Sequence, residues 1–129
     1  MANRTFQLNK LVRDGILEST EAIGGVVYYE TVQGVKKADL LIDKLFEEIQ
    51  EFDQGRDVKE LAQILGIFGA LATELGFSKK DLVTIEEEKQ RELGGYVNGI
   101  FVKTITLPET SEWVAYYASE PDRFPEITG

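Results

Sequence analysis

The chain has 129 residues, of which 43% are hydrophobic, and this is enough for one packed domain without a long disordered region. It contains no cysteine and no histidine, which excludes thiol nucleophiles, disulfides, imidazole bases and the usual zinc ligands. The net charge of −9 opposes binding to a nucleic-acid polymer, so a small anionic substrate would need a bridging cation.

The first predicted elements are a helix and a short strand. Asn9 can cap a helix over residues 10–23, which Gly24 and Gly25 would end. Residues 26–33 are rich in β-branched and aromatic side chains and are too few for a stable helix. They predict a strand or an extended arm.

Two amphipathic helices follow. Over residues 38–53 the apolar side chains recur at helical spacing on one narrow face, at Leu41, Leu45, Ile49 and Phe52. Gly55 ends this helix, and Asp57 can cap the next. The apolar side chains of that next helix also share one face, at Leu61, Leu65, Phe68, Ala72 and Leu75. The short loop between the helices predicts an antiparallel hairpin.

The last predicted helix begins after Gly76, where Ser78 and Asp81 resemble a capping box, and it runs to Leu93. Gly94 and Gly95 end it, and residues 96–107 favour β structure and can pair with residues 26–33. The sequence therefore predicts an all-α fold, an antiparallel helical bundle with a small β element, over residues 1–107. Residues 108–129 form an aromatic-containing tail, expected to pack on this domain or on a partner subunit.

We expect a cytoplasmic location. No apolar run approaches the length of a bilayer span, and residues 1–10 lack the apolar core of a signal peptide. No interaction with a membrane is therefore predicted.

Acidic side chains lie beside the apolar face of the first amphipathic helix. With Leu45 at the centre of that face, Glu48 lies roughly 60° and Glu51 roughly 120° to the same side. Glu47 lies roughly 160° away and is expected to orient water or to stand outside the ligand set. The two nearer carboxylates form a ridge along the buried seam.

The second amphipathic helix carries a matching ridge. Glu60 lies roughly 100° and Gln63 roughly 160° round from Leu61, on one flank. Carboxylates that converge beside an apolar seam repel one another, which raises their pKa values unless a cation neutralises them. Oxygen ligands without histidine or cysteine suit Mg²⁺ or Mn²⁺, which can activate water for attack on a phosphoanhydride. The alternative is a solvated helix face that pairs with neighbours such as Lys44.

Several strings support the metal interpretation together. They are Asn-Lys-Leu-Val-Arg-Asp at residues 9–14, the EExxE pattern within residues 44–52, Glu60 to Gln63, and the stretches 88–89, 94–96 and 100–102. In this order, over about residues 6–105, the chain resembles the MazG-like superfamily of all-α nucleoside triphosphate pyrophosphohydrolases, which includes phosphoribosyl-ATP pyrophosphohydrolase-like proteins.

The resemblance implies Mg²⁺-dependent hydrolysis of a nucleoside triphosphate, or a related nucleotide, to the monophosphate and pyrophosphate, with a possible house-cleaning role. It implies metal ligands at Glu48, Glu51, Glu60 and Gln63, with Glu47 and Glu48 in the catalytic motif. It also implies a homodimer or a dimer of dimers, which agrees with the need of long amphipathic helices for further apolar cover.

One departure from the family pattern affects activity. Gln63 stands where the family has an aspartate, and its amide oxygen can coordinate a metal but carries no charge and cannot serve as a general base. Gly66 stands where relatives often have an acid, and the loop over residues 52–59 is short for the superfamily. The alternative function is therefore a degenerate relative that binds a nucleotide or a protein partner without turnover.

The remaining candidates for substrate binding are four basic residues and two residues that follow Gly94 and Gly95. Basic side chains that could neutralise phosphate oxygens are Lys10, Arg13, Lys89 and Arg91. Tyr96 and Asn98 could contact a nucleotide base. The alternatives are ordinary helix-surface charges for the basic residues and hydrophobic packing for Tyr96.

Overall fold

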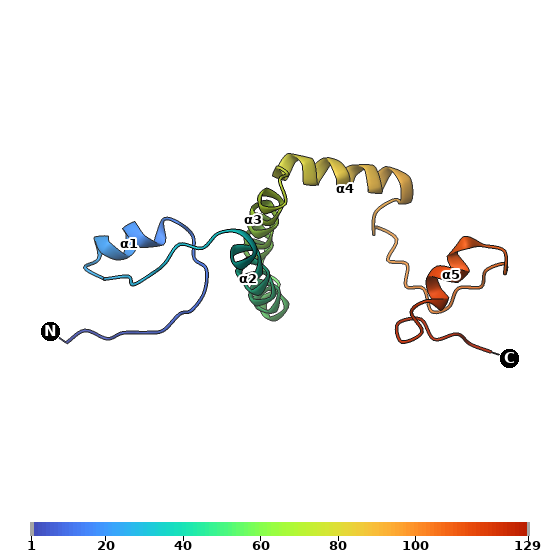
Figure 1. Cartoon of the computed structure of the whole chain (residues 1–129), viewed down its shortest axis with the longest axis horizontal. Helices are drawn as coiled ribbons and strands as arrows, with labels where there is room; N and C mark the ends of the chain where they lie inside the picture. The colour runs from blue at the N-terminus through green and yellow to red at the C-terminus, as the bar shows by residue number, and fades with distance from the viewer. Residues whose placement is uncertain (1, 129) are drawn as a thin grey trace. The chain divides into compact units, whose positions relative to one another are not determined.

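The computed structural model describes residues 2–128 (Figure 1). Within this range the chain forms five helices and no strand: α1 (Ile16–Ala22), α2 (Gly34–Gly55), α3 (Val58–Glu74), α4 (Lys79–Leu93) and α5 (Glu112–Ala118). The predicted all-α class is confirmed. The helices belong to two compact units, with α1 to α4 in the first and α5 in the second, which begins at Gly95.

Helix α1 is shorter than predicted. It begins at Ile16 after Gly15, which provides no side-chain cap, so the predicted start at Lys10 is wrong. Asn9 has a φ of 49°, in the left-handed region, whereas a helix N-cap needs an extended backbone. In the segment before α1, Lys10 instead donates a hydrogen bond to Glu47 of α2, and Arg13 donates one to Gln63 of α3. Tertiary contacts therefore override the local capping signal.

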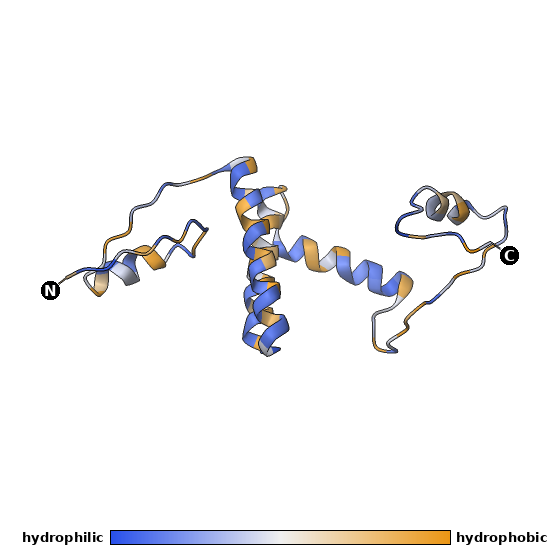
Figure 2. Ribbon diagram, turned by 90° about the horizontal axis from the view of Figure 1, so that it is seen from below, coloured by the Kyte–Doolittle hydropathy of each residue, from blue (hydrophilic) through white to orange (hydrophobic). Residues whose placement is uncertain are grey.

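The central feature of the first unit is a hairpin of α2 and α3, which lie side by side in Figures 1 and 2. Helix α2 ends at Gly55, and Arg56 adopts a left-handed conformation with a φ of 54°. Asp57 then caps α3, because its carboxylate accepts a hydrogen bond of 2.8 Å from the backbone N–H of Lys59. The two predicted amphipathic helices and the cap at Asp57 are confirmed.

The buried core of the described residues lies entirely on this hairpin. Its apolar members are Leu41 on α2 and Ile64, Ile67 and Ala72 on α3. Part of the face predicted to be buried is instead largely exposed, with relative exposures of 46% at Leu61, 45% at Leu65 and 40% at Phe68. Helix α3 is therefore apolar on two sides, one covered by α2 and one uncovered.

Helix α4 has the predicted start and end. Ser78 and Asp81 form a complete capping box, with hydrogen bonds of 2.8 Å and 3.0 Å, and Gly94 at φ 80° follows the last helical residue. The axis turns by 104° between α3 and α4, so α4 does not continue the hairpin as a bundle helix. Among residues 2–128, no single helix is both long and apolar enough to cross a membrane, although α3 and α4 meet those criteria as a bent pair.

Neither of the two predicted strands is formed in the part of the chain that the structure describes, so for residues 26–33, predicted as a strand or an extended arm, the strand alternative is wrong. Residues 26–33 and 96–107 have no ladder pairing, and Val26, Tyr28 and Val97 are almost fully exposed. A strand needs a neighbour for its backbone hydrogen bonds, so β propensity alone does not produce one.

The second unit contains α5 and an aromatic cluster. Ser111 caps the helix by accepting a hydrogen bond of 3.2 Å from the backbone N–H of Trp113. The rings of Tyr116, Tyr117 and Phe124 then pack edge to face or tilted, with centroids 5.0 to 5.9 Å apart. These aromatic residues of the tail therefore contact one another within their own unit.

Candidate metal centre

Three carboxylates meet across the central hairpin. Glu48 and Glu51 lie one turn apart on α2, and Glu60 lies in the first turn of α3. One carboxylate oxygen from each lies within 4.8 Å of the others. We call these three residues the carboxylate triad. The polar flanks predicted from the helical wheel thus come together at Glu48, Glu51 and Glu60.

Glu48 is the buried member of the carboxylate triad. Only 8% of its surface is exposed, and its Oε2 is buried with no hydrogen-bond partner. Burial raises the pKa of its carboxyl group, and the nearby Glu60 carboxyl group raises it further, against a smaller opposing effect of Lys44. A buried acceptor without a partner is costly in a folded protein, and a cation between the carboxylates would relieve that cost. The alternative of a solvated helix face does not describe Glu48.

Glu47 is not part of the carboxylate triad and pairs with its own cation, Lys10. The Lys10 ammonium donates a hydrogen bond of 2.8 Å to Oε1 of Glu47, which lowers the pKa of that carboxyl group. The pKa of Lys10 is raised mainly by Glu47, with smaller contributions from Glu51 and Glu48. Glu47 therefore stands beside the carboxylate triad as an ionised, paired group, in keeping with its outlying position on the helical wheel.

Gln63 is bonded to the second predicted cation. Arg13 donates a hydrogen bond of 2.6 Å from Nη2 to the amide oxygen of Gln63. The same guanidinium nitrogen would lie 3.3 Å from a Cβ atom added at Gly66, so the glycine leaves room for it. This contact was not predicted from the sequence. A possible signal was Gly66 itself, because a glycine inside a helix costs stability and often marks a close approach.

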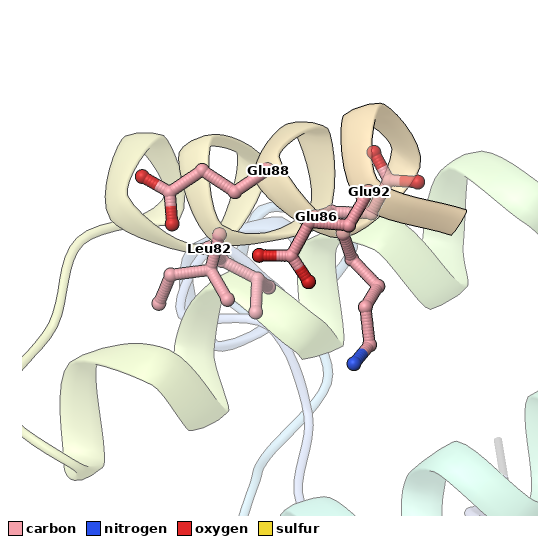
Figure 3. Close-up of a pocket in the computed structure, with 6 residues that line it drawn as sticks. Leu82, Glu86, Glu88 and Glu92 are labelled. Carbon is pink, nitrogen blue, oxygen red and sulfur yellow. The ribbon is translucent and has the colours of Figure 1, made fainter. Parts of the chain in front are cut away.

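The other predicted binding residues lie on α4 and in the second unit. Lys89 helps to line an open hollow built entirely from α4, with Leu82 and Ile85 as its apolar wall and Glu86, Glu88 and Glu92 around it (Figure 3). Among the described residues, no hydrogen bond or ion pair joins Lys89 or Arg91 to the carboxylate triad. Tyr96 and Asn98 are exposed and belong to the second unit.

The donor set of the carboxylate triad fits a hard divalent cation. Its three carboxylates supply oxygen only, and the chain has no histidine or cysteine that would favour zinc. The carboxylate triad can therefore hold a metal ion. The chain matches no family model, no curated protein and no solved structure. The chemistry of the site thus rests on its own residues.

Proposed function

We propose that the protein is a Mg²⁺-dependent nucleotide pyrophosphohydrolase, related to the MazG-like superfamily that its sequence strings resemble. The observation that carries the proposal is buried Glu48, whose Oε2 has no partner although two further carboxylates lie within 4.8 Å. Such a group suits a cation that in turn binds the phosphates of a substrate. Mn²⁺ is the expected substitute for Mg²⁺.

In the proposed reaction, water is added across the anhydride bond between the α and β phosphates, which yields the monophosphate and pyrophosphate. Glu48, Glu51 and Glu60 would hold the cation, which supplies charge neutralisation and activation of water. Glu47 keeps a low pKa beside Lys10, so it is ionised at neutral pH and can accept a hydrogen bond that orients the attacking water. Glu48 remains the innermost ligand.

The protein is further proposed to act as a homodimer, or a dimer of dimers, in which a second copy completes the antiparallel bundle. The uncovered side of α3 carries Leu61, Leu65 and Phe68, each at least 40% exposed. A helix that is apolar on two sides is normally enclosed by neighbours on both. A two-helix hairpin alone buries too little surface for a stable domain. The small β element expected over residues 26–33 and 96–107 belongs to the same proposal.

The test of the activity is pyrophosphate release from a panel of standard and modified nucleoside triphosphates with Mg²⁺ or Mn²⁺. Wild type should release pyrophosphate from at least one nucleotide. The Glu48→Gln variant should not, and Glu87→Gln, which changes an exposed carboxylate of α4, should match wild type. Absence of product with every nucleotide and both metals would contradict the enzymatic proposal.

A second candidate function is supported by Gln63. Because its amide oxygen accepts from Arg13 and carries no charge, the site has three acids rather than four. A weaker metal site is compatible with a protein that binds a nucleotide or a protein partner without turnover. This alternative predicts that a nucleotide raises the melting temperature in the presence of Mg²⁺ while no pyrophosphate forms.

A further inference from the structure

The surface of α3 next to the carboxylate triad forms a seat for one guanidinium group. Gln63 lies three residues after Glu60, so the two side chains are neighbours on the helix surface. Its amide oxygen accepts the 2.6 Å hydrogen bond from Nη2 of Arg13. One turn farther along, Gly66 has no side chain at the place where a Cβ would come within 3.3 Å of that nitrogen. The Gln63 amide oxygen and the space at Gly66 thus hold the guanidinium against α3, one to two turns after Glu60.

The hydrogen bond from Arg13 to Gln63 does not neutralise the charge of the guanidinium group, because the amide is uncharged. An arginine has five N–H donors, of which the Gln63 amide oxygen engages one by hydrogen bonding. An aspartate at position 63 would pair with the guanidinium and neutralise it, whereas an amide positions it without neutralising it. Lys10 differs, because its ammonium group already pairs with the Glu47 carboxylate. Among the described residues, Arg13 forms no ion pair, so its charge is available for a ligand.

We infer that Gln63 is a positioning residue for Arg13, and that the Arg13 guanidinium binds a phosphate group of a polyphosphate substrate beside the carboxylate triad. Gln63 then is not the fourth metal ligand. The inference rests on the proposed function, because it assumes a phosphate-bearing substrate at the metal site. It explains two departures from the acidic pattern at once, since Gln63 accepts a hydrogen bond from the guanidinium and a side chain at position 66 would crowd it.

The experiment separates metal binding from phosphate binding on the full chain. Binding of Mn²⁺ alone is measured from the paramagnetic resonance signal of the free ion, and binding of Mg²⁺–tripolyphosphate is measured by calorimetry at saturating Mg²⁺. The variants are Arg13→Gln, Gln63→Asp and the control Arg123→Gln, which removes an exposed arginine that pairs with Glu120 in the second unit. Melting temperatures verify that each variant is folded.

Arg13→Gln should weaken tripolyphosphate binding at least about tenfold, the usual loss for a charge-assisted hydrogen bond, and should leave Mn²⁺ affinity unchanged. Gln63→Asp should also weaken tripolyphosphate binding, although it strengthens the contact to Arg13. A purely structural role of Arg13 predicts the opposite for this variant: higher stability and unchanged phosphate binding. Arg123→Gln should behave as wild type. If Arg13→Gln does not fold, Arg13→Lys takes its place, and a smaller loss is expected because the charge is kept.

Two results would overturn the inference alone. One is an unchanged tripolyphosphate affinity in a folded Arg13 variant that still binds Mn²⁺. The other is a Gln63→Asp variant that binds Mn²⁺ more tightly without losing tripolyphosphate affinity, which would make position 63 a metal ligand. Failure of wild type to bind Mn²⁺ would instead overturn the proposed function and this inference with it.

Discussion

Replacing Glu48 by glutamine should make the metal-free protein more stable. The substitution keeps the size of the side chain and removes one charge from the carboxylate triad, whose oxygens lie within 4.8 Å of one another. Two unit charges at that separation repel by about 0.9 kcal/mol in water and by about 3.5 kcal/mol at an effective dielectric constant of about 20. Glu48 is buried while Glu51 is exposed, so the gain should be about 1 to 3 kcal/mol.

The effect should reverse when metal is added. In a chelator such as EDTA, Glu48→Gln should melt higher than wild type, by roughly 4 °C for each kcal/mol in a domain of this size. Mg²⁺ at about 100 times its dissociation constant should then stabilise wild type by about 2.7 kcal/mol and the variant by much less. The assay is thermal unfolding followed by circular dichroism, with and without Mg²⁺. Glu87→Gln is the control and should match wild type under both conditions.

Two results would refute this reasoning. If Glu48→Gln melts lower than wild type in EDTA, the buried carboxylate is not repelled by its neighbours and is part of the structural core. If Mg²⁺ stabilises wild type and variant equally, the metal does not bind at Glu48.

Three further predictions follow from the same structure. Because the pKa of Glu48 is raised in the folded state, its protonation contributes stability below its ordinary pKa of about 4.5, and this stability is lost as the pH rises through the raised value. In urea unfolding with EDTA, wild type should therefore lose stability relative to Glu48→Gln above about pH 4.5. Asp57→Ala removes the cap of α3 and should cost about 1 kcal/mol in urea unfolding, whereas an unchanged midpoint would show that the cap contributes nothing. Leu65→Glu, on the uncovered side of α3, should convert a dimer to a monomer in light scattering, and a wild type that is already monomeric would contradict the dimer proposal.

The central helices were predicted correctly because their sequences contain both the apolar periodicity and the capping residues of a helix. Residues 34–93 contain two strong apolar repeats, a cap at Asp57 and a capping box at Ser78, and the structure has a helix at each place. The first helix was predicted too long because Asn9 is a good cap by type, whereas its φ of 49° excludes that role. Helix α5 was not predicted, since seven residues hold too little periodicity for a helix signal.

The carboxylate triad was accessible to sequence reasoning, but its surroundings were not. Helical geometry alone places Glu48 and Glu51 on one flank, and a short loop brings Glu60 opposite them. The contacts from Lys10 to Glu47 and from Arg13 to Gln63 join residues 37 and 50 positions apart, where no local pattern applies. The burial of Ile64 and Ile67 rather than Leu65 and Phe68 likewise depends on which side of an apolar helix its neighbour covers.

The most direct test of the account is anomalous scattering from crystals of the protein grown with Mn²⁺. The account predicts one strong peak within coordination distance of Glu48, Glu51 and Glu60, and no such peak in crystals of Glu48→Gln. A peak at other residues only, or none in wild type at saturating Mn²⁺, would contradict the claim that the carboxylate triad is a metal centre.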